Sequence, residues 1–178
     1  MEGPFSDCRY SDRQREYARA FRSSRIYTPQ MVVNGRAEFV GSDADRAEQE
    51  IARALSAPYS ASLSARADLA GRSVVVQYDI EGRVGDVLLN AAVEEDGLVN
   101  AVRTGENAGR HLAHDGVVRA FVSHHPGESQ SGAVTLPLPD GLDVSRSRVV
   151  VTLQDRSMMR IRAAAIADLE QGGEELHE

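Results

Sequence analysis

The residues able to carry chemistry are few, and the single cysteine is the first of them. Cys8 is the only cysteine in the 178 residues, so the chain cannot complete a dithiol–disulfide cycle within itself. All 20 basic residues are arginine, which excludes a lysine Schiff base and a P-loop lysine. We therefore expect no catalytic residue here, and we interpret Cys8 as a surface or half-buried thiol.

A polar loop bracketed by glycines is the second candidate site. It contains Glu106, Asn107 and Arg110. Arg110 could bind a carboxylate that Asn107 orients. In the alternative interpretation the loop is structural, with Asn107 bonded to nearby backbone and Glu106 paired with Arg110 or Arg119. We favour the structural role, because the sequence places no nucleophile–base pair nearby.

Four histidines follow within a short stretch. His111 and His114 have the H-x-x-H spacing, and His124 and His125 are adjacent. Imidazole is a ligand for zinc and copper. However, neighbouring residues of a strand point to opposite faces, so His124 and His125 would not share one metal ion. We expect polar loop residues, no metal site and no cofactor.

A proline before a short apolar strand is the third candidate. Thr28 and Pro29 precede the strand expected at Met31–Val33, and Asn34–Gly35 is a strong type I′ turn signal that returns the chain through Ala37–Val40. A cis bond before Pro29 would expose the backbone of Thr28 to a substrate peptide. The alternative is an ordinary trans proline at the start of a strand.

A helix is predicted on each side of this hairpin. Ser11 and Gln14 have capping-box spacing, so the first helix begins near Asp12. The second covers about residues 43–56 and carries an apolar stripe, and Pro58 ends it. Residues 1–57 therefore form a helix–hairpin–helix unit.

Short strands separated by turn signals dominate the rest of the chain. This pattern favours an antiparallel β domain, sandwich-like or barrel-like, over residues 58–168. Residues 169–178 are expected to form a flexible acidic tail. The overall expectation is an α+β fold. The expected strands are Ser60–Arg66, Arg72–Ile80, Asp86–Glu94, Leu98–Thr104, Gly116–His124, Gly132–Leu136, Arg148–Gln154 and Met159–Ala167.

The charge balance limits the classes of partner that we expect for this chain. The chain has 27 acidic and 20 basic residues, a net charge of −7. Nine of each lie in residues 1–57, so the β part carries the whole excess. An acidic chain is a poor binder of phosphate backbones, and no apolar run is long enough to span a membrane. We expect neither nucleic acid nor membrane as a partner. The N-terminus also lacks the apolar core of a secretory signal.

Several segments together resemble a known family. The segment Tyr27–Gly35 is similar to the cis-proline segment of thioredoxin-like proteins, and more closely to the secreted, thioredoxin-like domain-of-unknown-function family 1223. The resemblance spans nearly the whole chain. The further matching segments are Gly3–Ser6, Arg13–Gln14, Tyr17–Ala18, Val40–Asp43, Gly105–Arg110 and Val117–Arg119.

The resemblance implies a partial thioredoxin-like unit with substrate-binding residues Thr28 and Pro29, in a periplasmic or secreted protein. It also implies a departure, because the family's C-x-x-C motif and the strands around it have no counterpart here, and Cys8 does not match the motif position. The leading hypothesis is a non-catalytic binding or interaction protein. The first alternative is a fragment of a periplasmic thiol–disulfide oxidoreductase whose C-x-x-C lies upstream of Met1. The second is a ligand-binding β domain that uses the Gly105–Arg110 loop.

The resemblance also predicts a partner surface. In the thioredoxin arrangement the strand Met31–Val33 would lie beside a strand that this chain lacks. An apolar strand edge left bare favours pairing with another chain. We therefore expect a second copy, a partner chain or the β domain to cover this edge.

Overall fold

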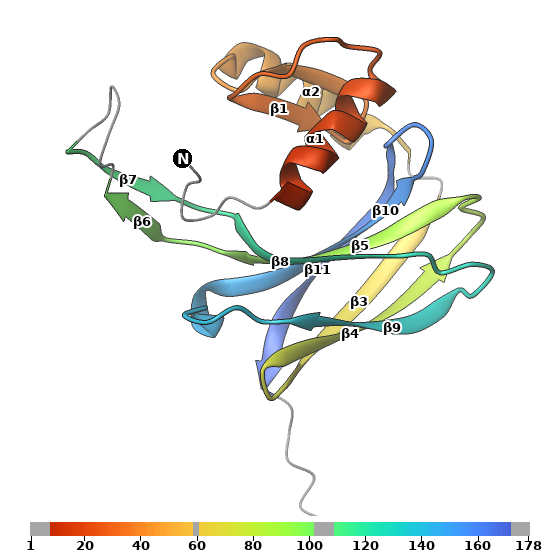
Figure 1. Cartoon of the computed structure of the whole chain (residues 1–178). Helices are drawn as coiled ribbons and strands as arrows, with labels where there is room; N and C mark the ends of the chain where they lie inside the picture. The colour runs from red at the N-terminus through yellow and green to blue at the C-terminus, as the bar shows by residue number, and fades with distance from the viewer. Residues whose placement is uncertain (1–7, 59–60, 102–108, 172–178) are drawn as a thin grey trace, which may run out of the picture.

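The computed structural model places two helices and a hairpin against one end of a curled β-sheet (Figure 1). It describes residues 8–58, 61–101 and 109–171. Helices α1 (Cys8–Ala20) and α2 (Ala44–Ser56) flank the hairpin of β1 (Gln30–Val33) and β2 (Ala37–Val40). The remaining strands are β3 (Ser62–Ala70), β4 (Ser73–Glu81), β5 (Val87–Glu95), β6 (Leu98–Ala101), β7 (His111–His114), β8 (Val117–His124), β9 (Ser131–Pro137), β10 (Ser147–Asp155) and β11 (Ile161–Gln171).

Seven of these strands form one sheet in the order β8-β5-β10-β11-β3-β4-β9. Every neighbouring pair is antiparallel except β11 and β3, which run parallel. The two edge strands β8 and β9 approach each other, so the sheet nearly closes into a barrel. The strands β6 and β7 form a separate hairpin that projects from this barrel (Figure 1).

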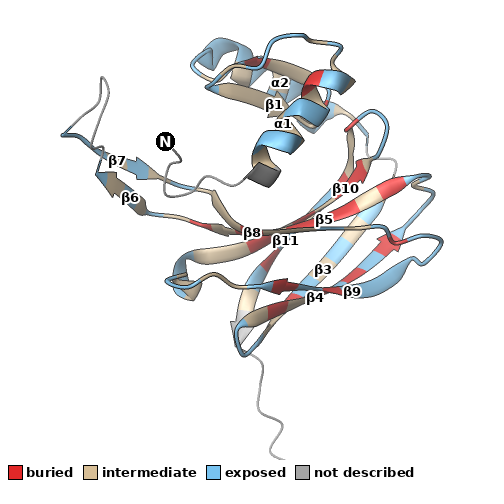
Figure 2. Cartoon of the chain, in the orientation of Figure 1, coloured by how far each residue is buried: buried red, intermediate tan, exposed pale blue. Residues whose placement is uncertain are grey.

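The hydrophobic core fills the inside of this barrel. Along β5 the side chains of Val87, Leu89, Ala91 and Val93 are buried at every second position, as the two-residue period of a strand requires. Figure 2 shows the same alternation of buried and exposed residues on the neighbouring strands. Ala120 on β8 and Leu136 on β9 are also buried, so both ends of the strand order contribute to one core.

The expected α+β fold, with a partial thioredoxin-like unit and a sandwich-like domain, is wrong. The protein is mostly β, and its main sheet is continuous. The physical reason lies in β11, which pairs with β10 over most of its length and with β3 through Leu169–Gln171. This strand joins what would otherwise be two sheets. The helices and the hairpin are an outer layer on the barrel and not a thioredoxin-like unit.

Two local expectations also differ from the structure. No strand is expected between Leu98–Thr104 and Gly116–His124, but this stretch contains β7, which pairs with β6. In addition, β11 continues to Gln171, beyond the boundary expected at residue 168. The eight expected strands all occur within a few residues of their expected positions, although the last three residues of the strand expected at Leu98–Thr104 lie outside the described residues.

The hairpin lies between the two helices. The guanidinium of Arg46 on α2 lies 5.5 Å from the ring centre of the buried Phe39 on β2. On the other face, Gln14 of α1 donates from Nε2 to Gln30 Oε1 on β1, at 3.4 Å. The outer layer is therefore three elements deep: helix, hairpin and helix.

The turn of the hairpin is fixed to the barrel by backbone contacts. Asn34 accepts a hydrogen bond at its carbonyl oxygen from the Ile161 N–H, at 3.0 Å. Gly35 has a φ of 62°, and a Cβ atom there would lie 2.0 Å from the carbonyl oxygen of Met159. Only glycine fits this position, because the turn rests directly on the loop between β10 and β11.

Candidate functional site

The proline segment begins the first strand of the hairpin. The peptide bond between Thr28 and Pro29 is cis, and both residues are exposed. The Pro29 carbonyl accepts a hydrogen bond from the Gly41 N–H, at 2.9 Å. This segment therefore lies at the surface, in line with the start of β1. Its predicted role in binding a peptide stays a prediction.

A cluster of polar side chains links this segment to α1 and β2. Its members are Gln14, Tyr27, Gln30 and Glu38. The Tyr27 hydroxyl donates to Glu38 Oε2, which also accepts from Gln30 Nε2 at 3.0 Å. Gln14 donates to the Tyr27 carbonyl at 3.1 Å. The bond to Glu38 raises the pKa of Tyr27, and the same bond lowers the pKa of Glu38. At neutral pH the tyrosine stays protonated and the carboxylate ionised, so the cluster acts as a structural clasp between α1 and the hairpin.

The predicted polar loop is only partly within the described structure. Glu106 and Asn107 lie outside the described residues, and Arg110 has an exposed side chain just before β7. Arg119, one of the expected partners of Glu106, forms an ion pair with Glu95. Because Glu106 and Asn107 are not described, the role of Glu106, Asn107 and Arg110 in a binding or structural loop stays a prediction.

Glu95 is a buried carboxylate that the sequence reasoning missed. Its side chain is 1% exposed. Arg119 donates to its Oε2, the Asp143 N–H donates to its Oε1 at 3.2 Å, and Arg146 Nη2 lies 3.8 Å from Oε1. The alternation of the strand could have predicted its burial. Glu95 follows the buried Val93 by two residues, on a strand that buries every second side chain. Among the described residues, these interactions join β5 to β8 and to the segment just before β10.

The four histidines do not come together. His111 and His114 stand at the two ends of β7. The ring of His124 lies 6.3 Å from that of Tyr78, and His125 Nε2 lies 3.2 Å from an oxygen of the exposed Asp86. Within the described ranges, no cluster of three or more His, Cys, Asp or Glu side chains is suited to hold a metal ion. Cys8 is the first residue of α1, and its side chain lies outside the described structure.

Helix α1 is bound to the outer face of the barrel through one buried glutamine. Gln154 Oε1 accepts from Arg13 Nη2 at 2.7 Å and from Asn90 Nδ2 at 3.0 Å. Its Nε2 donates to the Tyr17 hydroxyl at 2.9 Å and to the Met159 carbonyl at 2.7 Å. The side chain of Gln154 points away from the barrel interior, yet the residue is only 1% exposed, because α1 covers it. This residue joins three elements that are distant in sequence.

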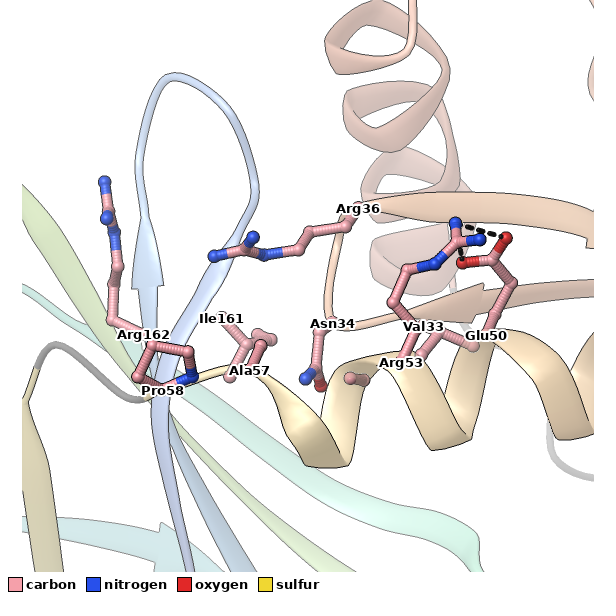
Figure 3. Close-up of a pocket in the computed structure, with 10 residues that line it drawn as sticks. Val33, Asn34, Arg36, Glu50, Arg53, Ala57, Pro58, Ile161 and Arg162 are labelled. Atoms are coloured by element: carbon pink, nitrogen blue, oxygen red, sulfur yellow. Dashed lines mark hydrogen bonds and ion pairs between the residues drawn. The ribbon is translucent and has the colours of Figure 1, made fainter.

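A cavity of about 150 Å³ lies where the hairpin turn, α2 and β11 meet (Figure 3). Its apolar wall comes from all three elements, and three arginines and one glutamate line it as well. Figure 3 shows Arg36 extending over Ile161 toward the loop between β10 and β11. The lining residues are Val33, Asn34, Arg36, Glu50, Arg53, Ala54, Ala57, Pro58, Ile161 and Arg162.

A second feature of the outer layer is a strand edge without a described partner strand, together with two exposed apolar side chains. Strand β1 pairs with β2 on one side, and no strand among the described residues pairs with its other edge. Helix α2 packs more closely against β1 than against β2 and has no buried residue. On this helix Ile51 is 44% exposed and Leu55 is 73% exposed. We call the free edge of β1 together with Ile51 and Leu55 the β1–α2 surface.

No helix in the described ranges is both long enough and apolar enough to cross a membrane. This finding concerns the two helices of the outer layer.

Among solved structures, the chain is similar to protein AGR_C_4864 from Agrobacterium tumefaciens, with 21% sequence identity and a TM-score of 0.64. The match covers 99% of this chain and 76% of that chain, and it shows a shared fold. A β-glucuronidase from Ruminococcus gnavus in complex with D-glucuronic acid matches with 13% identity and a TM-score of 0.30, over 62% of this chain and 16% of that one. A likeness this partial carries no functional argument. The comparison with curated proteins gives no match.

The comparison with protein families gives a match over most of the chain. Residues 2–154 match the model of the family described as "Protein of unknown function (DUF1223)". The match includes the whole outer layer and the barrel strands up to β10. The chain therefore belongs to the DUF1223 family.

Proposed function

We propose that the chain is a non-catalytic interaction protein that associates with a second copy of itself through the β1–α2 surface. The observations that carry this proposal are the edge of β1 that pairs with no described strand and the exposed residues Ile51 and Leu55 on α2, the helix that packs against β1. An unpaired strand offers backbone donors and acceptors to another strand, and a neighbouring apolar helix face supplies the burial that such pairing needs.

A two-fold arrangement fits the residues of this surface. Strand β1 has the sequence Gln-Met-Val-Val and carries no charge, so two copies can pair antiparallel without repulsion. A two-fold axis through this pair and perpendicular to the hairpin would bring the two α2 helices together on one face. Thr28 and Pro29 are exposed just before β1 and would extend the contact.

The charges along α2 do not oppose the same arrangement. Asp45 and Glu48 lie in the first half of the helix together with Arg46. Arg53 in the last turn is paired with Glu50. With three acids and two arginines, the helix brings a net charge of only −1 to a contact with a second copy.

Sedimentation velocity on the purified chain tests the proposal. We expect a concentration-dependent dimer at micromolar concentrations. Leu55→Glu should raise the dimer dissociation constant by more than tenfold, because burial of a leucine is worth about 1.5–3 kcal/mol and every 1.4 kcal/mol is a factor of ten. Val32→Arg on β1 should act in the same direction.

The matched control is Val99→Glu, since Val99 is 63% exposed and lies on the projecting β6–β7 hairpin. This variant should associate as the wild-type chain does. A wild-type chain that stays monomeric at 200 µM, a ceiling chosen to be roughly a hundredfold above a micromolar constant, would refute the proposal. An equal loss with Val99→Glu would place the interface elsewhere.

A further inference from the structure

The cavity between the hairpin turn, α2 and β11 combines an apolar wall with positive charge. Val33, Ala54 and Ile161 contribute hydrocarbon surface from β1, α2 and β11. The charged lining consists of three arginines and one glutamate, a net of two positive charges in a chain whose net charge is −7. An amphipathic cavity of positive charge is complementary to a small organic anion.

One of the three arginines has donors that a ligand can reach. Arg36 is exposed at the mouth, and no hydrogen bond or ion pair of its guanidinium occurs within the described structure. Arg162 Nη2 donates to Asp155 at 2.9 Å. However, its Nε is buried and has no acceptor among the described residues. This nitrogen has almost no accessible surface, and Figure 3 shows the Arg162 side chain extending along the β10–β11 hairpin away from Arg36. Arg162 therefore belongs to the wall, and Arg36 is the arginine left to bind an anion.

The glutamate of the lining does not oppose an anion. Both oxygens of Glu50 accept from Arg53 Nη1 at 3.2 Å. Figure 3 shows this ion pair at the end of the cavity away from Arg162. The charge of Glu50 is therefore neutralised within the wall, and Arg36 remains to face a ligand.

The volume sets the size of the ligand. A cavity of about 150 Å³ accommodates a molecule as large as benzene, and the volume here is about 150 Å³. Guanidinium groups bind carboxylates through paired N–H donors. A body of six to eight carbon atoms with one carboxylate is thus about the largest ligand that the cavity holds.

We propose that this cavity is a binding site for a small monocarboxylate with an apolar body. Arg36 holds the carboxylate, and Val33, Ala54 and Ile161 contact the hydrocarbon part. The cavity shares β1 and α2 with the surface proposed for self-association but is not lined by Val32, Ile51 or Leu55, so different variants test the two proposals.

Titration calorimetry with benzoate tests this site, with benzyl alcohol as the neutral probe of similar size and inorganic phosphate as the anion without an apolar body. For a ligand of so few atoms we expect a dissociation constant in the millimolar range. Arg36→Gln should weaken benzoate binding about tenfold. Ala54→Phe should abolish it by filling the cavity. Far-UV circular dichroism checks that both variants fold.

The control is Arg110→Gln, which removes an exposed arginine elsewhere and should leave benzoate binding unchanged. Weak binding of benzyl alcohol and of phosphate, at least tenfold below benzoate, supports the proposal. The proposal is overturned if benzoate does not bind, if benzyl alcohol or phosphate binds as tightly, or if folded Ala54→Phe binds benzoate as the wild type does. Equal losses with Arg36→Gln and Arg110→Gln would also overturn it, because they would reflect general charge.

Discussion

Replacement of Gln154 by leucine should destabilise the protein by about 3 kcal/mol. Leucine keeps most of the volume but removes four hydrogen bonds. Asn90 and the Met159 carbonyl belong to buried residues, and each would lose its Gln154 partner. A buried polar group left without its partner costs about 1–3 kcal/mol. Tyr17 and Arg13 are only partly buried, so water can replace their bonds to Gln154.

For a chain of this length, each kcal/mol shifts the melting temperature by roughly 2–4 °C. The expected decrease for Gln154→Leu is therefore about 6–12 °C, measured by circular dichroism during heating. Helix α1 should also be released earlier, so trypsin should cleave after Arg15 and Arg19 sooner than in the wild type. The control is Thr152→Val on the same strand and the same outer face, with an expected change within about 1 kcal/mol. A loss below 1 kcal/mol for Gln154→Leu, or a loss equal to that of the control, would refute this account of how α1 is held.

Three further outcomes follow from the same structure. Gly35→Ala should reduce the free energy of unfolding by more than about 2 kcal/mol in urea titrations, because its Cβ would meet a backbone oxygen of the β10–β11 loop. The control is Gly71→Ala, because Gly71 has a similar φ and a Cβ there would have no atom within 4 Å. This control should lose only about 1 kcal/mol. Burial raises the pKa of Asp155, but bonds from two backbone N–H groups, a serine and an arginine outweigh it and bring the pKa to about 2. Its ionised form should therefore contribute up to about 2 kcal/mol above pH 4 and lose this as the pH falls from 4 to 2, a slope that Asp155→Asn should flatten in urea titrations at several pH values. Arg119→Leu should lower the free energy of unfolding by about 3 kcal/mol, because it leaves the buried carboxylate of Glu95 without its main partner. Arg72→Leu removes an exposed ion pair and should change this free energy by less than about 1 kcal/mol. Equal losses in urea titrations would contradict the buried character of the Arg119–Glu95 pair.

The local elements could be predicted from the sequence, because their signals are local. Asn34–Gly35 marks the hairpin turn, and both residues have positive φ in the structure. The strands β3–β5 and β8–β11 appear where alternation and turn residues placed them. Strand β7 was missed, because His111–His114 contains two histidines and follows a polar stretch.

The arrangement of these elements could not be predicted, because it depends on pairs that are distant in sequence. Nothing in the alternation of Leu169–Gln171 indicates a parallel partner at Ala67–Leu69, yet this pair joins the sheet into one barrel. Likewise, Gln154 has the phase of a solvent-facing residue, and it is buried only because a helix from the start of the chain covers it. The cavity has the same origin, since Arg36 and Arg162 come from opposite ends of the sequence.

The contact between Gly35 and Met159 sets an order for biosynthesis. The hairpin turn leaves the ribosome 124 residues before the loop on which it rests. At about 5–20 residues per second, this interval lasts roughly 6–25 s. During that time the residues of the outer layer are already made, but the β10–β11 loop on which its hairpin turn rests is not. The apolar residues of α2 and β1 are then open to solvent. The nascent chain therefore has the greatest need of a chaperone before β10 and β11 are made. Synthesis of β11, the last strand of the barrel, also allows the outer layer at the start of the chain to bind the barrel.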